Sequence, residues 1–313
     1  GIEAEKYLRA AREIIAKALK AAEKEIIFTS GGTEANNMAL IGIAEAYKRA
    51  GRHIVTTAIE HASVLSTMKY LEEQGYSVTY LNVDKSGRID INELKNAITD
   101  ETILVSVMYV NNEIGAVEPI EEIGKIIKER NQDTIFHVDA IQAFGKYKIY
   151  PKKLKIDALS VSGHKIHGPK GIGFLYVSDK VKIRPIMHGG GQQRGLRSGT
   201  DNVPGIAGMG QAVKEAYTDM ETKVNKMREL RNYLTDSLLK LPDVRINSGR
   251  EAEGAPNIVS VSFIGVRSEV MLHALEEKGV YVSSGSACSS NKPGVSSTLK
   301  AIGIDRETID STL

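Results

Sequence analysis

Apolar positions alternate between two spacings along the first half of the chain. Between Tyr7 and Leu19 they return every three or four residues, which is the spacing of an amphipathic helix. The short apolar run "EIIFT" at 25–29 then predicts a buried strand. This alternation continues to residue 177. The predicted strands are 25–29, 53–58, 77–83, 102–110, 134–140, 156–162 and 171–177, and the predicted helices are 33–50, 62–74, 91–98 and 119–130.

Strands that alternate with helices predict an α/β fold, with a mainly parallel seven-stranded sheet and helices on both faces. The run at 171–177 follows the strand before it so closely that we expect it to be an antiparallel member. In sheets of this kind, ligands bind outside the carboxyl ends of the strands. The residues that follow each predicted strand are therefore the first place to look for chemistry.

The pattern changes after residue 177. It predicts one long charged helix from about 208 to 240 and a smaller unit after it. We place a domain boundary near 218, so that residues 1–218 form a large domain and 219–313 a smaller C-terminal α/β domain. In the smaller domain the predicted strands are 257–263 and 280–284, and the predicted helices are 268–278 and 296–302.

Composition narrows the class of protein. The chain has 313 residues, of which 42% are apolar and 26% charged, so it can bury a full core. A net charge of +2 favours neither nucleic acid nor a membrane surface as a partner. The sequence contains no apolar run of about 18 residues, and its charged start lacks a secretory apolar region. The single cysteine, Cys288, excludes an intrachain disulfide and a multi-cysteine zinc site, and we expect a reducing, cytoplasmic setting.

The stretch "FTSGGTEANN" at 28–37 follows a predicted strand and opens a predicted helix. Gly31 and Gly32 let the backbone approach a ligand closely. Thr33 and the first free N–H groups of the helix would then face that ligand as a phosphate cup. An ordinary capped turn is the alternative for this motif alone. The stretch is not a Walker loop, because no Gly-Lys-Ser/Thr follows it.

Polar residues also follow four other predicted strands. "IEHASV" contributes His61 and "YVNNEIG" contributes Asn111 and Asn112. "HVDAIQ" places Asp139 at the end of a buried strand, where a carboxylate needs a partner, and adds Gln142 three residues later. Each of these side chains alone could be a cap or turn residue. The fifth cluster, in "SVSGHKIHGPKGIG" at 160–173, holds Ser162, His164 and Lys165.

One ligand accounts for the whole set. A phosphate cup, a carboxylate for a ring cation, an aromatic stacker and an amine nucleophile together match pyridoxal phosphate. We expect Lys165 to lie among small residues because the cofactor needs the space. A zinc site built from His61, His164, His167 and Asp139 is the weaker interpretation. Its two histidines lie in a Gly/Pro turn, no helix face aligns them, and Lys165 is left unexplained.

Seven motifs carry a close resemblance to the NifS/IscS cysteine desulfurases, fold type I pyridoxal-phosphate transferases of the class V aminotransferase family. The resemblance covers nearly all 313 residues. "SGHK" is typical of fold type I in general, whereas "SSGSAC" points to the long-loop group of desulfurases. The motifs are "TSGGTEANN", "EHASV", "VNNEIG", "HVDAIQ", "SVSGHKIHGPKG", "RSGTDNVPGIAGMG" and "SSGSACSS".

The resemblance implies a role for each candidate residue. Lys165 carries the cofactor as a Schiff base and moves the Cα proton of the substrate. His61 stacks on the ring and shares proton transfers, and Asp139 pairs with the ring nitrogen. The remaining roles are bonds to the ring hydroxyl or substrate from Asn112 and Gln142, phosphate contacts from Gly32, Thr33, Ser162 and His164, and a contact from Thr200 to the phosphate of a neighbouring subunit, which implies a homodimer.

Cys288 also gains a role from the resemblance. Its thiolate takes sulfur from L-cysteine as a persulfide and L-alanine leaves. The sulfur then passes to an acceptor protein, either an iron–sulfur scaffold or a thiolation carrier. The alternatives are a selenocysteine lyase, another fold type I enzyme such as an aminotransferase, and a non-catalytic sulfur-delivery scaffold. Family members extend at both ends and carry an arginine for the substrate carboxylate in the C-terminal part. We therefore expect the printed chain, as a fragment, to be a poor desulfurase.

Overall fold

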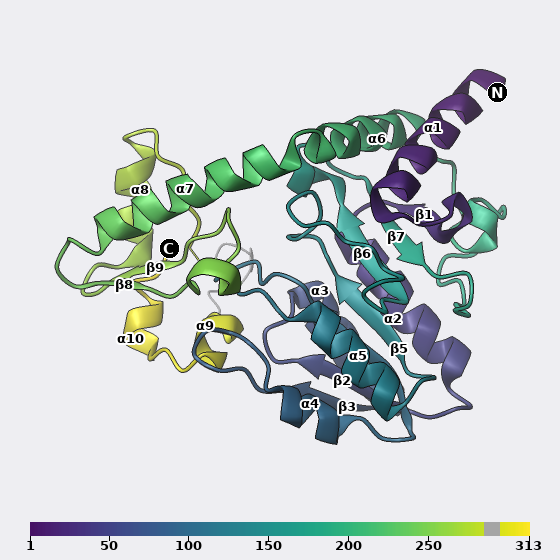
Figure 1. Cartoon of the computed structure of the whole chain (residues 1–313), viewed down its shortest axis with the longest axis horizontal. Coiled ribbons are helices and arrows are strands. Elements are labelled where there is room, and N and C mark those ends of the chain that lie inside the picture. Colours follow the sequence, from purple (N-terminus) through teal and green to yellow (C-terminus); the bar gives the residue numbers. More distant parts are fainter. Residues whose placement is uncertain (285–294) are drawn as a thin grey trace.

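A seven-stranded sheet forms the centre of the molecule (Figure 1). The computed structural model describes residues 1–284 and 295–313. The strand order is β1-β7-β6-β5-β4-β2-β3, and only β7 runs antiparallel to its neighbours, which confirms the predicted sheet and its antiparallel member. The strands are β1 (Ile26–Thr29), β2 (His53–Thr57), β3 (Ser77–Leu81), β4 (Thr102–Met108), β5 (Ile135–Asp139), β6 (Ala158–Ser162) and β7 (Gly173–Val177).

Helices cover both faces of this sheet, as predicted. Successive strand residues point to opposite faces, so Leu104 packs on one side and Val105 on the other. Fully burying a side chain of this size contributes about 1.5–3 kcal/mol, so the two apolar layers dominate the stability of the fold. One face carries α1 (Ile2–Leu19), α4 (Ile91–Ala97), α5 (Ile120–Arg130) and α6 (Val203–Tyr217), and the other carries α2 (Gly32–Tyr47) and α3 (Ala62–Glu73).

On the α2 side, the central strands become polar toward their carboxyl ends. The buried His137 imidazole bonds through Nδ1 to Ser106 Oγ at 2.8 Å and through Nε2 to Ser160 Oγ at 2.9 Å. Burial lowers the pKa of His137 to about 3, so the ring is neutral. Asp139 follows two residues later on the same face of β5. The polar path across β4, β5 and β6 therefore leads to the strand end where the candidate residues lie.

The predicted helix at 208–240 is wrong in one respect, because the structure has two helices there. α6 begins earlier, at Val203, where Asn202 Oδ1 accepts from Gly205 N at 3.1 Å. α7 (Met220–Leu238) begins after Asp219, whose φ of 51° lies in the left-handed region. Aspartate tolerates that conformation better than most residues. Because apolar residues recur at helical spacing on both sides of the break, periodicity alone did not reveal it. Figure 1 shows α6 and α7 running in sequence along one side of the molecule.

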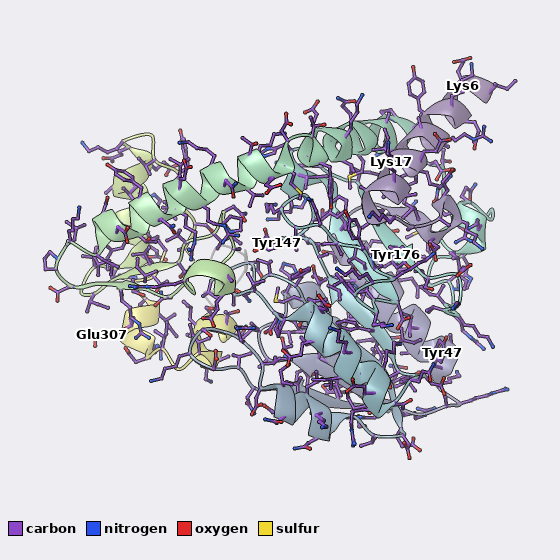
Figure 2. All side chains as sticks on the ribbon, viewed as in Figure 1. Lys6, Lys17, Tyr47, Tyr147, Tyr176 and Glu307 are labelled. Carbon is purple, nitrogen blue, oxygen red and sulfur yellow. The ribbon has the colours of Figure 1, made fainter. Side chains whose placement is uncertain are left out.

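The C-terminal elements lie around α7. The expected strand at 280–284 is wrong: these residues form no strand, and Tyr281 is 82% exposed. The division of the chain near residue 218 stays a prediction. Figure 2 shows Tyr147, which stacks on Tyr109 at 5.3 Å between ring centroids, at the border between the sheet and these elements. The C-terminal elements are β8 (Val244–Ile246), β9 (Val261–Phe263), α8 (Ser268–Glu276), α9 (Ser297–Ala301) and α10 (Arg306–Ile309).

No helix in residues 1–284 or 295–313 is both long and apolar enough to cross a membrane.

Candidate cofactor site

The sheet brings the predicted candidate residues to one edge. β5 ends at Asp139 and β6 ends at Ser162, and the two strands run in parallel side by side. β1, β2 and β4 run in the same direction as these strands. Their carboxyl ends lead to Thr33 in the first turn of α2, to His61 just before α3 and to Asn112 in the loop after β4. The edge expected from the sequence therefore exists, because parallel strands end on the same side of a sheet.

Asp139 is almost fully buried at this edge, with 4% of its surface exposed. Its Oδ1 accepts from Ile141 N at 3.0 Å, and its Oδ2 accepts from Asn36 Nδ2 at 2.8 Å. Burial raises the pKa of Asp139, while these two hydrogen bonds act to lower it. A carboxylate held by one donor on each oxygen keeps lone pairs for a further donor. The site is thus suited to a cationic N–H group of a ligand.

Asn36 and Ser63 connect Asp139 to His61, and neither was among the predicted site residues. Asn36 is fully buried on α2, and its Nδ2 also donates to Ser63 Oγ at 2.9 Å. Ser63 Oγ lies 2.8 Å from His61 Nδ1, and His61 is the N-cap of α3. Both residues fall inside motifs that the sequence analysis singled out. The available signal was an asparagine on a helix face otherwise made of Ala35, Met38 and Ala39.

The turn between β1 and α2 approaches Ser162 closely. Gly31 has a φ of 153°, which L side chains rarely adopt. A Cβ at Gly32 would lie 2.2 Å from Ile141 Cδ1 and 3.4 Å from Ser162 Cβ. Ser162 Oγ in turn lies 2.9 Å from His164 Nδ1. The start of α2, where the first N–H groups lack helical partners, therefore faces a serine–histidine pair, as an anion site requires.

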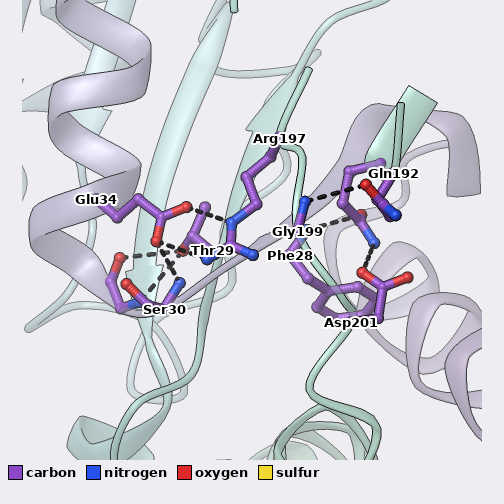
Figure 3. Close-up of polar contacts among 10 residues, drawn as sticks. Phe28, Thr29, Ser30, Glu34, Gln192, Arg197, Gly199 and Asp201 are labelled. Carbon is purple, nitrogen blue, oxygen red and sulfur yellow. Dashed lines mark hydrogen bonds and ion pairs between the residues drawn. The ribbon is translucent and has the colours of Figure 1, made fainter. Parts of the chain in front are cut away.

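An ion pair fastens the segment before Thr200 to the same turn (Figure 3). Arg197 Nε lies 2.7 Å from Glu34 Oε1, and Arg197 Nη2 lies 3.2 Å from Glu34 Oε2. Glu34 Oε2 also accepts from Ser30 N at 2.9 Å. Although burial opposes the change, these bonds hold the pKa of Glu34 below its ordinary value. Thr200 lies three residues beyond Arg197 and is exposed, so a contact of Thr200 with another subunit stays a prediction.

Lys165 lies directly after β6, in the short helical turn η2 (Gly163–Ile166), with its side chain exposed. Its backbone carbonyl accepts from Lys146 Nζ at 3.3 Å. Burial, together with the charge of Lys165, lowers the pKa of Lys146 to about 8. Lys146 was not predicted as part of the site. The contact means that the turn carrying Lys165 is held by a second amine from the loop after β5.

The two asparagines after β4 differ in what they contact. The Asn111 amide joins its own loop to the loop after β2: Nδ2 donates to Ile59 O, and Oδ1 accepts from Glu113 N and Ile114 N, each at 2.9 Å. This leaves Asn112, which is half-buried, as the candidate for ligand contact. Gln142 is also half-buried, three residues after Asp139.

A cleft of about 390 Å³ lies between the start of α2 and α3. It brings Thr33 and His61 together and is also lined by Ser63, Thr67 and Tyr70. Within the described ranges, no three His, Cys, Asp or Glu side chains gather as a metal site. Cys288 lies outside the described residues.

Comparison with known proteins adds the family. The model of the family "Aminotransferase class-V" matches residues 1–304. The chain belongs to this family and, within it, to the cysteine desulfurases. Cysteine desulfurase IscS of Clostridium botulinum is 47% identical over 98% of this chain and 78% of that protein. IscS of Methanosarcina thermophila is 49% identical over 97% of this chain and 74% of that protein.

Solved structures agree with this assignment. A NifS-like protein superposes with a TM-score of 0.93 at 41% identity, over 100% of this chain and 82% of that one. A structure titled "SspA in complex with cysteine" superposes with a TM-score of 0.85 at 38% identity, over 100% of this chain and 87% of that one. The family implies pyridoxal phosphate as cofactor, and the fold type I architecture predicted from the sequence is confirmed.

Proposed function

We propose that this chain is a pyridoxal-phosphate-dependent cysteine desulfurase that converts L-cysteine to L-alanine and passes the sulfur to an acceptor protein. The observation that carries the proposal is Asp139, a buried carboxylate held by two donors at the end of β5. It lies on the same sheet edge as Lys165 and the Gly31–Gly32 turn. Family membership and relatives named cysteine desulfurases support the same reaction.

The residues at this edge fit the cofactor. The Gly32 position has no room for a Cβ, and the helix start there faces Ser162 and His164, which suits a phosphate group. Asp139 can pair with a protonated ring nitrogen, and His61 lines the adjacent cleft from which it would contact the ring. When bound, pyridoxal phosphate supplies an aldehyde that takes up an amino group and a ring that withdraws electrons from Cα.

The chain's own side chains then have defined tasks. Lys165 holds the cofactor and takes the proton from Cα of the substrate. Asn112 and Gln142 orient the reacting groups, while Asp139 keeps a negative charge beside the ring nitrogen. By resemblance to the family, the Cys288 thiolate attacks the substrate sulfur. An S–S bond forms, the Cβ–Sγ bond breaks, its electron pair stays with Cβ, and protonation there gives alanine. The products are L-alanine and a persulfide on Cys288. We further propose a homodimer in which Thr200 contacts the cofactor phosphate of the partner.

The test loads the purified chain with pyridoxal phosphate. Borohydride reduction should fix the cofactor on the peptide that contains Lys165, and Lys165→Ala should abolish this label. With L-cysteine and a thiol reductant, L-alanine and sulfide should appear in equal amounts. Cys288→Ser should keep the cysteine-induced change in visible absorbance and lose nearly all sulfide.

Several outcomes would contradict the proposal. Label on another lysine would reject the role of Lys165. A keto acid product would indicate an aminotransferase, and turnover of L-selenocysteine but not of L-cysteine would indicate a selenocysteine lyase. A chain whose absorbance does not respond to cysteine would be a sulfur-delivery scaffold.

A further inference from the structure

A chain of hydrogen bonds runs from Asp139 through Asn36 and Ser63 to His61. When Asp139 is ionised, the donors and acceptors in this chain have only one consistent arrangement. A carboxylate is an acceptor only, so Asn36 must present Nδ2 to Asp139 Oδ2 at 2.8 Å. The second hydrogen of the same Nδ2 goes to Ser63 Oγ at 2.9 Å. Turning the amide over would place Asn36 Oδ1 against the carboxylate oxygen. The charge on Asp139 therefore fixes the orientation of the Asn36 side chain.

This orientation leaves one buried polar atom of the Asn36 side chain without a hydrogen-bond partner in the described part of the chain, which is energetically unfavourable. Asn36 Oδ1 is buried and has no hydrogen-bond partner among the described residues. A buried acceptor without a partner is unfavourable, so an asparagine that served packing alone would be expected to turn its oxygen toward a donor. Asn36 instead aims both N–H bonds of its amide at Asp139 and Ser63.

The same counting continues to His61. Ser63 Oγ accepts from Asn36 and lies 2.8 Å from His61 Nδ1, and it donates its single hydrogen there because that nitrogen already acts as an acceptor in another hydrogen bond. The backbone N–H of Ser63 donates to the same nitrogen at 3.1 Å. His61 Nδ1 thus accepts two hydrogen bonds and carries no hydrogen of its own. The hydrogen of the neutral ring is on Nε2, the atom that remains for a ligand.

We propose that Asn36 and Ser63 are positioning residues through which ionised Asp139 adds the Ser63 hydroxyl as a second donor to His61 Nδ1, beside the backbone N–H of Ser63, and so strengthens the tautomer with its hydrogen on Nε2. With Asp139 ionised, His61 presents Nε2–H as a donor toward the ligand. If Asp139 is neutral, it can donate to Asn36 Oδ1, the amide turns over, and the Ser63 hydroxyl follows it away from His61. A cationic ring nitrogen bound at Asp139 keeps the carboxylate ionised and so maintains the donor tautomer. This use of the linkage rests on the proposed function, whereas the linkage itself is a property of the chain alone.

The test is a double-mutant cycle on the full chain, read by ¹⁵N NMR of His61 without cofactor or substrate. Asp139→Asn supplies a neutral side chain of the same size. In the wild-type background we expect it to move the Nδ1 resonance toward that of a protonated nitrogen. The same change made in Asn36→Leu or Ser63→Ala should leave the resonance where that single variant has it.

Asn37→Leu is the matched control. Asn37 is the next residue on α2, and its amide bonds Thr33 O and Thr67 Oγ1 rather than Asp139. In this background the response of His61 to Asp139→Asn should persist in full. A response of equal size with and without Asn36 would overturn the proposal, because it would mean that the charge acts through space. An Nδ1–H tautomer in the wild-type chain would also overturn it.

A second measurement uses the cofactor-loaded chain. Pyridoxal phosphate should bind about tenfold more weakly to Asn36→Leu than to the wild-type chain, because Asp139 loses a donor that stabilises its charged form. Equal affinities would contradict the proposal. If Asn36→Leu does not fold, Ser63→Ala carries the NMR test alone, since it keeps the backbone N–H that caps α3. Failure of the NMR cycle leaves the desulfurase proposal standing, because that measurement contains no cofactor.

Discussion

Replacing Asp139 by asparagine removes one negative charge and keeps the side-chain size. In the structure each carboxylate oxygen accepts one bond, from Ile141 N and from Asn36 Nδ2. An asparagine has one oxygen for these two donors, so its NH₂ group faces Asn36, whose amide turns over to accept from it. The NH₂ group of Asn36 then takes the buried position of Oδ1, which has no hydrogen-bond partner among the described residues. A buried donor left without an acceptor costs about 1–3 kcal/mol, and we expect the free energy of unfolding to fall by that amount.

The effect on catalysis should be larger than the effect on folding. Asp139 is the charged group that would hold the ring nitrogen protonated, and preorganised electrostatic groups of this kind are worth about 3–4 kcal/mol each. The expected loss in kcat is therefore roughly 10²–10³-fold. Sulfide and L-alanine released per bound cofactor measure this loss, and the visible spectrum confirms that the cofactor is still present.

Glu60 provides the matched control for Asp139→Asn. It is also a buried carboxyl group at the carboxyl edge of the sheet, and its Oε1 accepts from Thr57 Oγ1 at 2.8 Å and Met108 N at 2.9 Å. Burial raises the pKa of Glu60 well above its ordinary value, which favours the neutral carboxyl group, and we expect Glu60→Gln to change kcat little. If Asp139→Asn loses less than tenfold with cofactor bound, or if Glu60→Gln loses as much as Asp139→Asn, the assignment of the charge to Asp139 is wrong.

Two further predictions concern stability. Burial raises the pKa of Glu118 from 4.5 to about 8, so the contribution of Glu118 to stability is fully present below pH 4.5 and lost as the pH rises through 8. Relative to Glu118→Gln, the free energy of unfolding of the wild-type chain, measured in urea, should fall by on the order of 4 kcal/mol between pH 4.5 and 8. Parallel pH curves for the two chains would contradict this. Arg197→Gln should lower the free energy of unfolding by about 1–3 kcal/mol, because the part-buried Glu34 loses a bidentate partner. Arg197→Lys should restore only part of it, since an ammonium lacks the planar fork, and full restoration would show that charge alone matters.

The sequence by itself determined most of the local structure and the edge of the sheet at which the candidate residues lie. Successive strand residues, such as Leu104 and Val105, face different helical layers, and this follows from the two-residue period of a strand. The positions of Asp139 and Ser162 at the ends of strands, and of Lys165 in the turn that follows, came from the same pattern. These features depend only on neighbours along the chain, so periodicity and motif spacing predicted them.

Only the tertiary structure decided which distant side chains meet. Asn36 contacts Asp139 across 103 positions of sequence, and Arg197 contacts Glu34 across 163. Both contacts depend on the strand order, which places β1 beyond β7 and β6 and so sets where α2 crosses the sheet. Spacing along a chain does not contain this order. The break between α6 and α7 was hidden for a related reason, because two non-helical residues, the extended Thr218 and the left-handed Asp219, end one helix and start the next without changing the apolar period.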